Sequence, residues 1–310
     1  MQCSQCTNES AAELKYSSIF LCKHHFISLF EKRIRHTIRQ NKLLRHDDRI
    51  AVGLSGGKDS SVLLKILSEL TKKVRKTSIF AVTIDEGISG YSDFVVETSS
   101  ALCEEMGVEH HVFSFRNEIG MTLDELADKM KNFEKQPPVC SYCGVLRRNL
   151  LNIKARELGA TKLAIGHNLD DECQAMLMNL IRGDLNRITR MGTLVGVIRN
   201  EKFVPKIKPL RECPEDEIRL YANLNEIKFN SLKCSYAQQS FRSTIRKALN
   251  DIEEKHPGSK FQLLKSTDEL ILVLREAHKI EELPNKCKIC GELASGEVCK
   301  FCELLQKIKN

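Results

Sequence analysis

Cysteine provides the most distinctive chemistry of this sequence, because most of its 13 cysteines occur in closely spaced groups. Near each end of the chain, two pairs of ligand-type residues occur, and the members of each pair are separated by two residues. This spacing is typical of structural zinc sites, and thirteen cysteines in an intracellular chain favour metal over disulfides. We therefore predict two zinc sites, whose metal stabilises segments with little apolar content. The ligands are Cys3, Cys6, Cys22 and His25 at one end, and Cys287, Cys290, Cys299 and Cys302 at the other. Their similarity suggests that the two ends pack together.

These sets leave six cysteines, namely Cys103, Cys140, Cys143, Cys173, Cys213 and Cys234. Cys103 and Cys173 lie in helical patterns and are expected to be small buried side chains. Cys140, Cys143 and Cys234 remain as a triad. Three thiolates suit an iron–sulfur cluster in which one iron lacks a protein ligand. They equally suit a nucleophilic cysteine that carries a persulfide and has a resolving partner, and spacing does not decide between the two.

Residues 50–60 predict a phosphate-binding site. Residues 50–54 are an apolar strand, 55–57 read Ser-Gly-Gly and predict a tight turn, and a helix begins near Asp59. A glycine turn at a helix N-terminus presents backbone N–H groups to an anion. The stretch is not a Walker A loop, because Asp59, not Ser or Thr, follows Lys58.

Strands alternate with helices through most of the chain, which predicts an α/β fold with a parallel sheet. The predicted strands are 50–54, 79–85, 110–114 and 162–166. The predicted helices include 92–106, 122–131, 145–158 and 263–280, with another starting near Pro214. Ligands of such sheets bind at the carboxyl ends of the strands, so Ile84 and Asp85 are expected near a bound nucleotide.

Charged residues add two further features. The acidic run Asp170-Asp171-Glu172 either supplies a catalytic acid or base, or neutralises a helix N-terminus. A basic amphipathic helix is predicted over residues 26–46, and residues 206–211 form a basic extended stretch. With a formal charge of +7 and a pI of about 8.7, these features fit a nucleic-acid partner.

The overall composition predicts a cytoplasmic protein of three parts. The chain has 310 residues, 42% of them hydrophobic, but it contains no apolar run long enough to span a bilayer and no secretory signal. We expect an N-terminal zinc module over residues 1–27, a catalytic domain over 28–250, and a C-terminal helical segment with the four-cysteine site over 251–310.

The string Ser55-Gly56-Gly57-Lys58-Asp59-Ser60 resembles the PP-loop of the ATP pyrophosphatases, which cleave ATP between the α and β phosphates. The order of motifs along nearly the whole chain resembles the TtcA/TtuA family of tRNA 2-thiolation enzymes. These motifs are the N-terminal Cys/His set, the PP-loop, Cys-x-x-Cys-Gly at 140–144, Gly-His-Asn-Leu-Asp-Asp-Glu at 166–172, Lys-Pro-Leu-Arg-Glu at 208–212, the lone Cys234 and the C-terminal four-cysteine set. The two zinc sites place the chain in the uridine-modifying branch.

The resemblance implies a role for each motif. A [4Fe–4S] cluster would be held by Cys140, Cys143 and Cys234. ATP would be bound by Gly53, Leu54, Ser55, Gly56, Gly57, Lys58, Asp59, Ser60, Ile84, Arg147 and Gly166. Asp171, or alternatively Asp170, would be the catalytic acid, and Lys58, Asp59 and Arg147 would assist catalysis. Because some relatives carry Lys at the position of Arg147, proton transfer by an arginine is doubtful there.

The implied reaction is ATP-dependent 2-thiolation of a tRNA uridine. ATP and Mg²⁺ would adenylate uracil O2 with release of pyrophosphate, and sulfur would replace AMP. The sulfur would come from sulfide or from a ubiquitin-like carrier protein. Many lysines and isoleucines, with an oxygen-sensitive cluster, favour wobble position 34 over position 54, and the family implies a homodimer. Two alternatives remain: amide-forming adenylation of the tRNA lysidine synthetase or NAD synthetase type, and a non-catalytic zinc-ribbon RNA-binding protein.

Overall fold

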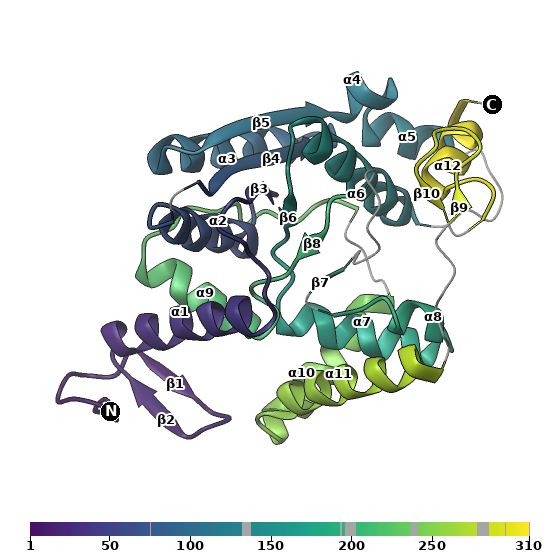
Figure 1. Ribbon diagram of the computed structural model, residues 1–310. Coiled ribbons are helices and arrows are strands. Elements are labelled where there is room, and N and C mark those ends of the chain that lie inside the picture. Colours follow the sequence, from purple (N-terminus) through teal and green to yellow (C-terminus); the bar gives the residue numbers. More distant parts are fainter. Residues whose placement is uncertain are drawn as a thin grey trace.

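A six-stranded sheet forms the centre of the computed structural model, which describes all residues except 75, 132–137, 193, 196–202, 237–240, 278–284, 295 and 310 (Figure 1). The strand order is β5-β4-β3-β6-β8-β7. The strands are β3 (Arg49–Gly53), β4 (Ser78–Asp85), β5 (Glu109–Ser114), β6 (Lys162–Ala164), β7 (Leu194–Val195) and β8 (Lys206–Ile207). Five strands are parallel, and only the edge strand β7 is antiparallel to its neighbour β8. The predicted α/β fold with a parallel sheet is therefore confirmed.

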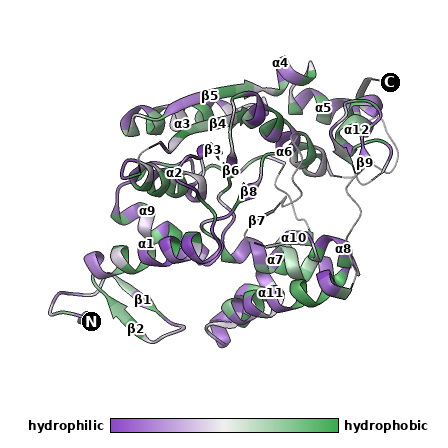
Figure 2. Ribbon diagram, viewed as in Figure 1, coloured by the Kyte–Doolittle hydropathy of each residue, from purple (hydrophilic) through white to green (hydrophobic). Residues whose placement is uncertain are grey.

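Successive residues of the strands face opposite layers, as the two-residue period of a strand requires. Ile50 and Val52 belong to one hydrophobic core together with α1, α2, α3 and α9. Ala51, Phe80 and Val82 belong to a second core together with α6. Figure 2 shows hydrophobic and hydrophilic residues alternating along the helices that cover the sheet. Both faces of the sheet are thus covered, which leaves its carboxyl edge as the place for a site.

Twelve helices lie in the described part of the chain. They are α1 (Lys23–Gln40), α2 (Lys58–Thr71), α3 (Ser92–Met106), α4 (Phe115–Ile119), α5 (Leu123–Met130), α6 (Val139–Glu157), α7 (Leu169–Ile181), α8 (Leu185–Ile188), α9 (Glu215–Leu224), α10 (Phe241–Lys255), α11 (Ser259–Ala277) and α12 (Lys300–Lys309). Helices α7, α10 and α11 pack on one another beside the sheet. None of these helices is long and apolar enough to cross a membrane.

The two largest differences from the predicted helix boundaries are at the start of α6 and at the end of α1. The helix expected to begin at residue 145 begins at Val139, directly after Pro138, so Cys140 and Cys143 lie in its first two turns. Proline is well tolerated at such a start, because the N–H that it lacks would have no intrahelical partner. The basic helix expected to reach residue 46 ends at Gln40, because Lys42 adopts a positive φ of 47°. Residues 278–280, the predicted end of the helix starting at 263, lie outside the described residues.

The two cysteine-rich ends lie on opposite faces of the sheet (Figure 1). The N-terminal hairpin, β1 (Ala12–Leu14) and β2 (Ile19–Leu21), packs into the core that contains α1 and α2. The C-terminal module, β9 (Asn285–Lys286), β10 (Leu293–Ala294) and α12, packs into the core that contains α6. The prediction that the two ends pack together is therefore wrong: each covers a different apolar surface. The predicted domain boundaries at 27/28 and 250/251 fall inside α1 and α10.

Candidate active site

The turn between β3 and α2 has the strand–turn–helix geometry predicted for residues 50–60. Gly56 has a φ of +68°, which a side chain would strain, and Gly57 is the N-cap residue of α2. The Ser60 hydroxyl closes the turn, because it donates to the Gly57 carbonyl (3.0 Å) and accepts from the Ser55 N–H (3.2 Å). The N–H groups of the first turn of α2 have no acceptor within the helix, and together they form a cradle for phosphate.

Lys58 lies between two carboxylates at this turn. Its Nζ donates to Asp59 Oδ2 (2.9 Å) and to Glu215 Oε1 at the start of α9 (2.8 Å). Burial lowers the pKa of Lys58, but the two carboxylates outweigh it and the net pKa is raised. Burial raises the pKa of Asp59, and Lys58 and Asn168 only partly oppose this effect. Lys58 is thus held charged beside the phosphate cradle, at a position where an incoming phosphate would compete with Glu215.

The carboxyl end of β6 lies next to this turn, because β3 and β6 are neighbours at the point where the strand order reverses. Gly166 packs so closely against α2 that a Cβ there would be 3.0 Å from the Ser60 N and from the Asp59 carbonyl carbon. Asn168 is the N-cap of α7, and its side chain donates to Asp59 Oδ1 (2.9 Å). Two motifs far apart in the sequence, at 55–60 and 166–172, therefore form one site.

Asp170 and Asp171 point to different surroundings. Asp171 forms the capping box of α7 with Asn168, and its Oδ1 lies 3.4 Å from Arg242 Nη1. Burial raises the pKa of Asp171, although Arg242 opposes the shift. Asp170 instead accepts from the Glu215 N–H (2.8 Å) and from Lys260 Nζ, so both of its oxygens are used to join α7, α9 and α11. Of the two predicted acids, Asp171 is therefore the one that lies near Asp59, close enough for its charge to act on that carboxylate.

The residues predicted to surround the adenosine lie at the ends of β3 and β4. Leu54 and Ile84 are buried, and the Thr83 hydroxyl donates to the Leu54 carbonyl (2.9 Å), which fixes the two strand ends together. A Cβ at Gly53 would lie 2.9 Å from the Leu151 side chain. These positions form one wall beside the phosphate cradle.

The cysteine triad lies at the same edge of the sheet, at the N-terminus of α6. Burial and the nearby Cys234 raise the pKa of Cys140, while burial, Cys234 and Cys140 raise the pKa of Cys143 to about 12. Cys140 Sγ also donates to the carbonyl of Tyr236 (2.7 Å), which holds the segment of Cys234 against α6. Among the described residues, the ligands of each terminal set all lie within 4.8 Å of one another, whereas the three sulfurs of the triad do not. Three separated thiols fit a cluster, which is larger than a single ion.

Arg147 links the triad to the end of β4. Its guanidinium donates to Glu86 Oε1 (2.9 Å), and the Glu86 side chain is buried. Burial lowers the pKa of Arg147, but Glu86 and Cys143 outweigh it, and the arginine stays charged. A fixed positive charge one helical turn from Cys143 would stabilise a negatively charged group bound to the thiolates.

The structure brings each terminal set of four ligands together. In the N-terminal set, His25 Nδ1 lies 3.3 Å from Cys3 Sγ and 3.4 Å from Cys22 Sγ, which selects His25 over His24. In the C-terminal set, the backbone N–H of Cys299 donates to Cys287 Sγ. Burial raises the pKa of Cys3 and Cys287, but such backbone hydrogen bonds outweigh it and lower each to about 6. One such thiolate in each set, with the other three ligand atoms at this separation, suits Zn²⁺.

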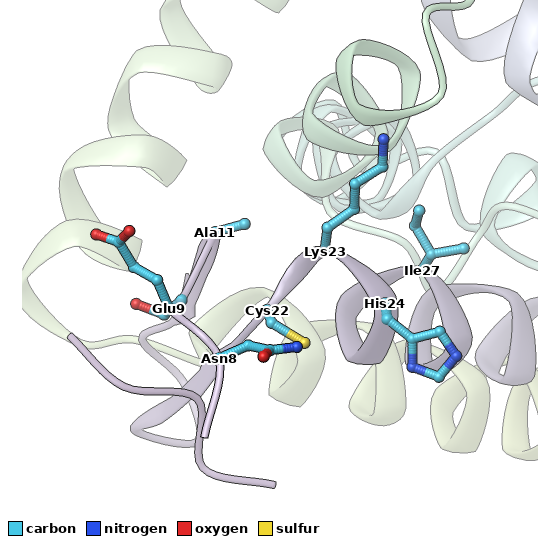
Figure 3. Close-up of a pocket in the computed structure, with 8 residues that line it drawn as sticks. Asn8, Glu9, Ala11, Cys22, Lys23, His24 and Ile27 are labelled. Atoms are coloured by element: carbon cyan, nitrogen blue, oxygen red, sulfur yellow. The ribbon is translucent and has the colours of Figure 1, made fainter. Parts of the chain in front are cut away.

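A solvent-open hollow of about 580 Å³ lies beside the N-terminal set, between the hairpin and the start of α1 (Figure 3). Asn8, Glu9, Cys22, Lys23 and His24 are among the residues that line it. The hollow does not include the PP-loop or the cysteine triad, and we assign it no part in the chemistry.

The structure adds residues that the sequence did not single out for the site. Glu215 was expected only to start a helix, yet it binds Lys58 across 157 positions of sequence. Glu86 binds Arg147, and Asn168 binds Asp59. Each pairing depends on which strand ends are neighbours, so no local pattern could identify it. Only Asn168 had a sequence signal, since it belongs to the motif at 166–172.

This fold and site define the class of protein. A family model described as the PP-loop domain matches residues 27–253, and the chain belongs to that family.

Within it, the chain belongs with the tRNA 2-thiolation proteins. It is 35% identical to the tRNA 2-thiolation protein NcsA of Haloferax volcanii over 100% of this chain and 99% of that one. It is 32% identical to the tRNA-5-methyluridine(54) 2-sulfurtransferase of Pyrococcus horikoshii, over 98% and 93%. The solved structure of the U34-tRNA thiolase NcsA from Methanococcus maripaludis, with its [4Fe–4S] cluster, covers 99% of this chain and 96% of its own, with a TM-score of 0.84 and 36% identity.

Proposed function

We propose that this protein is an ATP-dependent tRNA uridine 2-thiolase that acts in the cytoplasm. One observation carries the proposal: Cys140, Cys143 and Cys234 meet at the same sheet edge as the PP-loop. Amide-forming PP-loop enzymes have no use for three thiols there. A vestigial RNA-binding protein has no use for Lys58 held charged beside the phosphate cradle.

Cys140, Cys143 and Cys234 would hold a [4Fe–4S] cluster. When bound, such a cluster supplies one iron that lacks a protein ligand and can bind sulfide. Arg147 lies beside Cys143 and would offset the negative charge at this position. The terminal sets would hold one Zn²⁺ each and stabilise the two modules.

The PP-loop would bind the ATP phosphates, and its amides and Lys58 would stabilise the charge that develops as pyrophosphate leaves. Asp59 would help to hold Mg²⁺, a hard cation that prefers oxygen ligands. The chain would thus activate uracil O2 as an adenylate. Asp171, whose pKa is raised by burial, would hold or transfer a proton at the base.

Relatives acting on position 34 and position 54 are both similar to this chain. We propose position 34, because the match to the U34-tRNA thiolase covers almost the full length of both chains at 36% identity, against 32% for the position-54 enzyme. Sulfide or a ubiquitin-like carrier would supply the sulfur, and the active form would be a homodimer.

The test is to purify the protein without oxygen and incubate it with unmodified tRNA, ATP, Mg²⁺ and sulfide. Mass spectrometry of the digested nucleosides should show ATP-dependent 2-thiouridine, and mapping should place it at position 34. Cys140→Ala should abolish the product, while Cys103→Ala, at a buried position in α3 away from the triad, should retain it. ATP cleavage without thiolated uridine, despite an intact cluster and an added carrier protein, would contradict the proposal and favour amide formation.

A further inference from the structure

Several cations converge beside the PP-loop without enough carboxylates to balance them. Arg148 comes from α6, Lys206 from β8 and Arg242 from the start of α10. Arg148 is near enough to each of the other two for their charges to interact. Burial, Arg147 and Arg242 lower the pKa of Arg148, while burial, Arg148 and Lys208 lower that of Lys206 to about 8. Cations held at such a place favour the binding of an anion.

The neighbouring cations are already paired with carboxylates. Lys208 Nζ lies 2.6 Å from Glu172, and Arg187 lies 2.9 Å from Asp184. In contrast, within the part of the chain that the structure describes, no carboxylate lies within ion-pair distance of Arg148 or Lys206.

The side chains of the unbalanced cations have only weak or shared partners. Lys206 Nζ lies over the ring of Phe203, 5.4 Å from its centroid, and Arg242 shares Asp171 at 3.4 Å. Among the described residues, only one of the three cations, Arg242, therefore has a carboxylate within ion-pair distance.

A neutral hydrogen-bonding group lies among these cations. His167 follows β6, and its pKa is lowered to about 4 by burial and by Lys208, Arg242 and Arg148, despite the opposing effect of Glu172. The imidazole is therefore uncharged at neutral pH, and its ring N–H can donate a hydrogen bond to an anion. It precedes Asn168, which binds Asp59 of the PP-loop.

We propose that Arg148, Lys206 and Arg242 form a second phosphate site, which binds a backbone phosphate of the RNA next to the target uridine. The proposal rests on the proposed function. The PP-loop has its own amides and Lys58 for ATP. Arg148 lies near enough to Cys143 and to Arg242, the partner of Asp171, to interact with both electrostatically. A uridine that reacts between the triad and Asp171 places its flanking phosphate near Arg148. Contacts between such cations and the phosphate backbone fix the register of a bound nucleic acid.

The test is the salt dependence of tRNA binding, measured by fluorescence anisotropy with unmodified tRNA and without ATP or sulfur donor. Arg148→Gln and Lys206→Gln should each reduce the slope of log Kd against log salt by about 0.7–0.9, as expected for one lost phosphate contact. Arg148→Lys, which retains the charge, should keep most of the slope. The matched control is Lys73→Gln, an exposed cation just after α2, at the opposite edge of the sheet.

Two outcomes would overturn the proposal. One is an unchanged slope in both glutamine variants. The other is weakened ATP binding with an unchanged tRNA slope, which would assign these cations to the nucleotide phosphates. The measurement does not depend on thiolation, so a reduced slope in a protein that makes no thiouridine would support the phosphate site and contradict the proposed reaction.

Discussion

Replacing Gly166 with alanine tests whether close packing of β6 against α2 shapes the phosphate cradle. Gly166 does not have a positive φ, so alanine adds no backbone strain and the effect is steric. The new Cβ would lie 3.0 Å from the Ser60 N and the Asp59 carbonyl carbon, and these backbone atoms would have to move by a few tenths of an ångström. Overpacking of this kind costs about 1–3 kcal/mol.

The displaced atoms belong to the first turn of α2, whose N–H groups face the phosphates, so we expect the cost to appear as weaker ATP binding. If all of it does, affinity falls by about 5- to 150-fold. Isothermal titration with a non-hydrolysable ATP analogue measures this effect, and thermal unfolding measures any share lost to stability.

Gly53→Ala is the comparison, because its Cβ would meet the end of the flexible Leu151 side chain at 2.9 Å. A leucine side chain can move to relieve the contact, so this variant should lose less affinity than Gly166→Ala. Wild-type affinity and stability in Gly166→Ala, or a larger loss in Gly53→Ala, would refute the reasoning.

Three further predictions follow from other parts of the structure. Glu217→Gln leaves the largely buried guanidinium of Arg33 without its carboxylate, and should lower the free energy of unfolding by about 3 kcal/mol in a denaturant titration. The control Glu297→Gln, in an exposed ion pair with Lys288, should cost less than about 1 kcal/mol, and equal losses would contradict the assignment. The pKa of Lys206 is lowered to about 8, so its charge is present below that pH and lost above it. The affinity for tRNA should therefore fall as pH rises from about 7 to 9. Lys206→Arg should flatten this pH dependence, and an equally steep profile in that variant would contradict the role of Lys206. Elemental analysis should find two Zn²⁺ per chain, and only one in Cys302→Ser.

The sequence predicted the elements well where one local rule decides them. The strands around Ile50 and Ile84 are continuous apolar runs, and the PP-loop is a compact motif, so both could be read directly. The start of α6 was predicted at residue 145, but the helix begins directly after Pro138 and already carries Cys140. The partners of Lys58 could not be predicted, since Glu215 approaches it only through packing of α9 on α2.

The start of α9 has a consequence for how the chain becomes active during synthesis. There, the Glu215 carboxylate accepts a hydrogen bond from Lys58, which lies 157 positions earlier in the sequence. The Glu215 N–H donates to Asp170, and Asp170 also accepts from Lys260, which lies 90 positions after Asp170. On the ribosome, the glycine turn emerges early, but these partners emerge only when most of the chain has been made. A nascent chain would therefore carry an incomplete nucleotide site until α11 had left the exit tunnel. ATP would bind fully only to the finished protein, and would stabilise that form selectively.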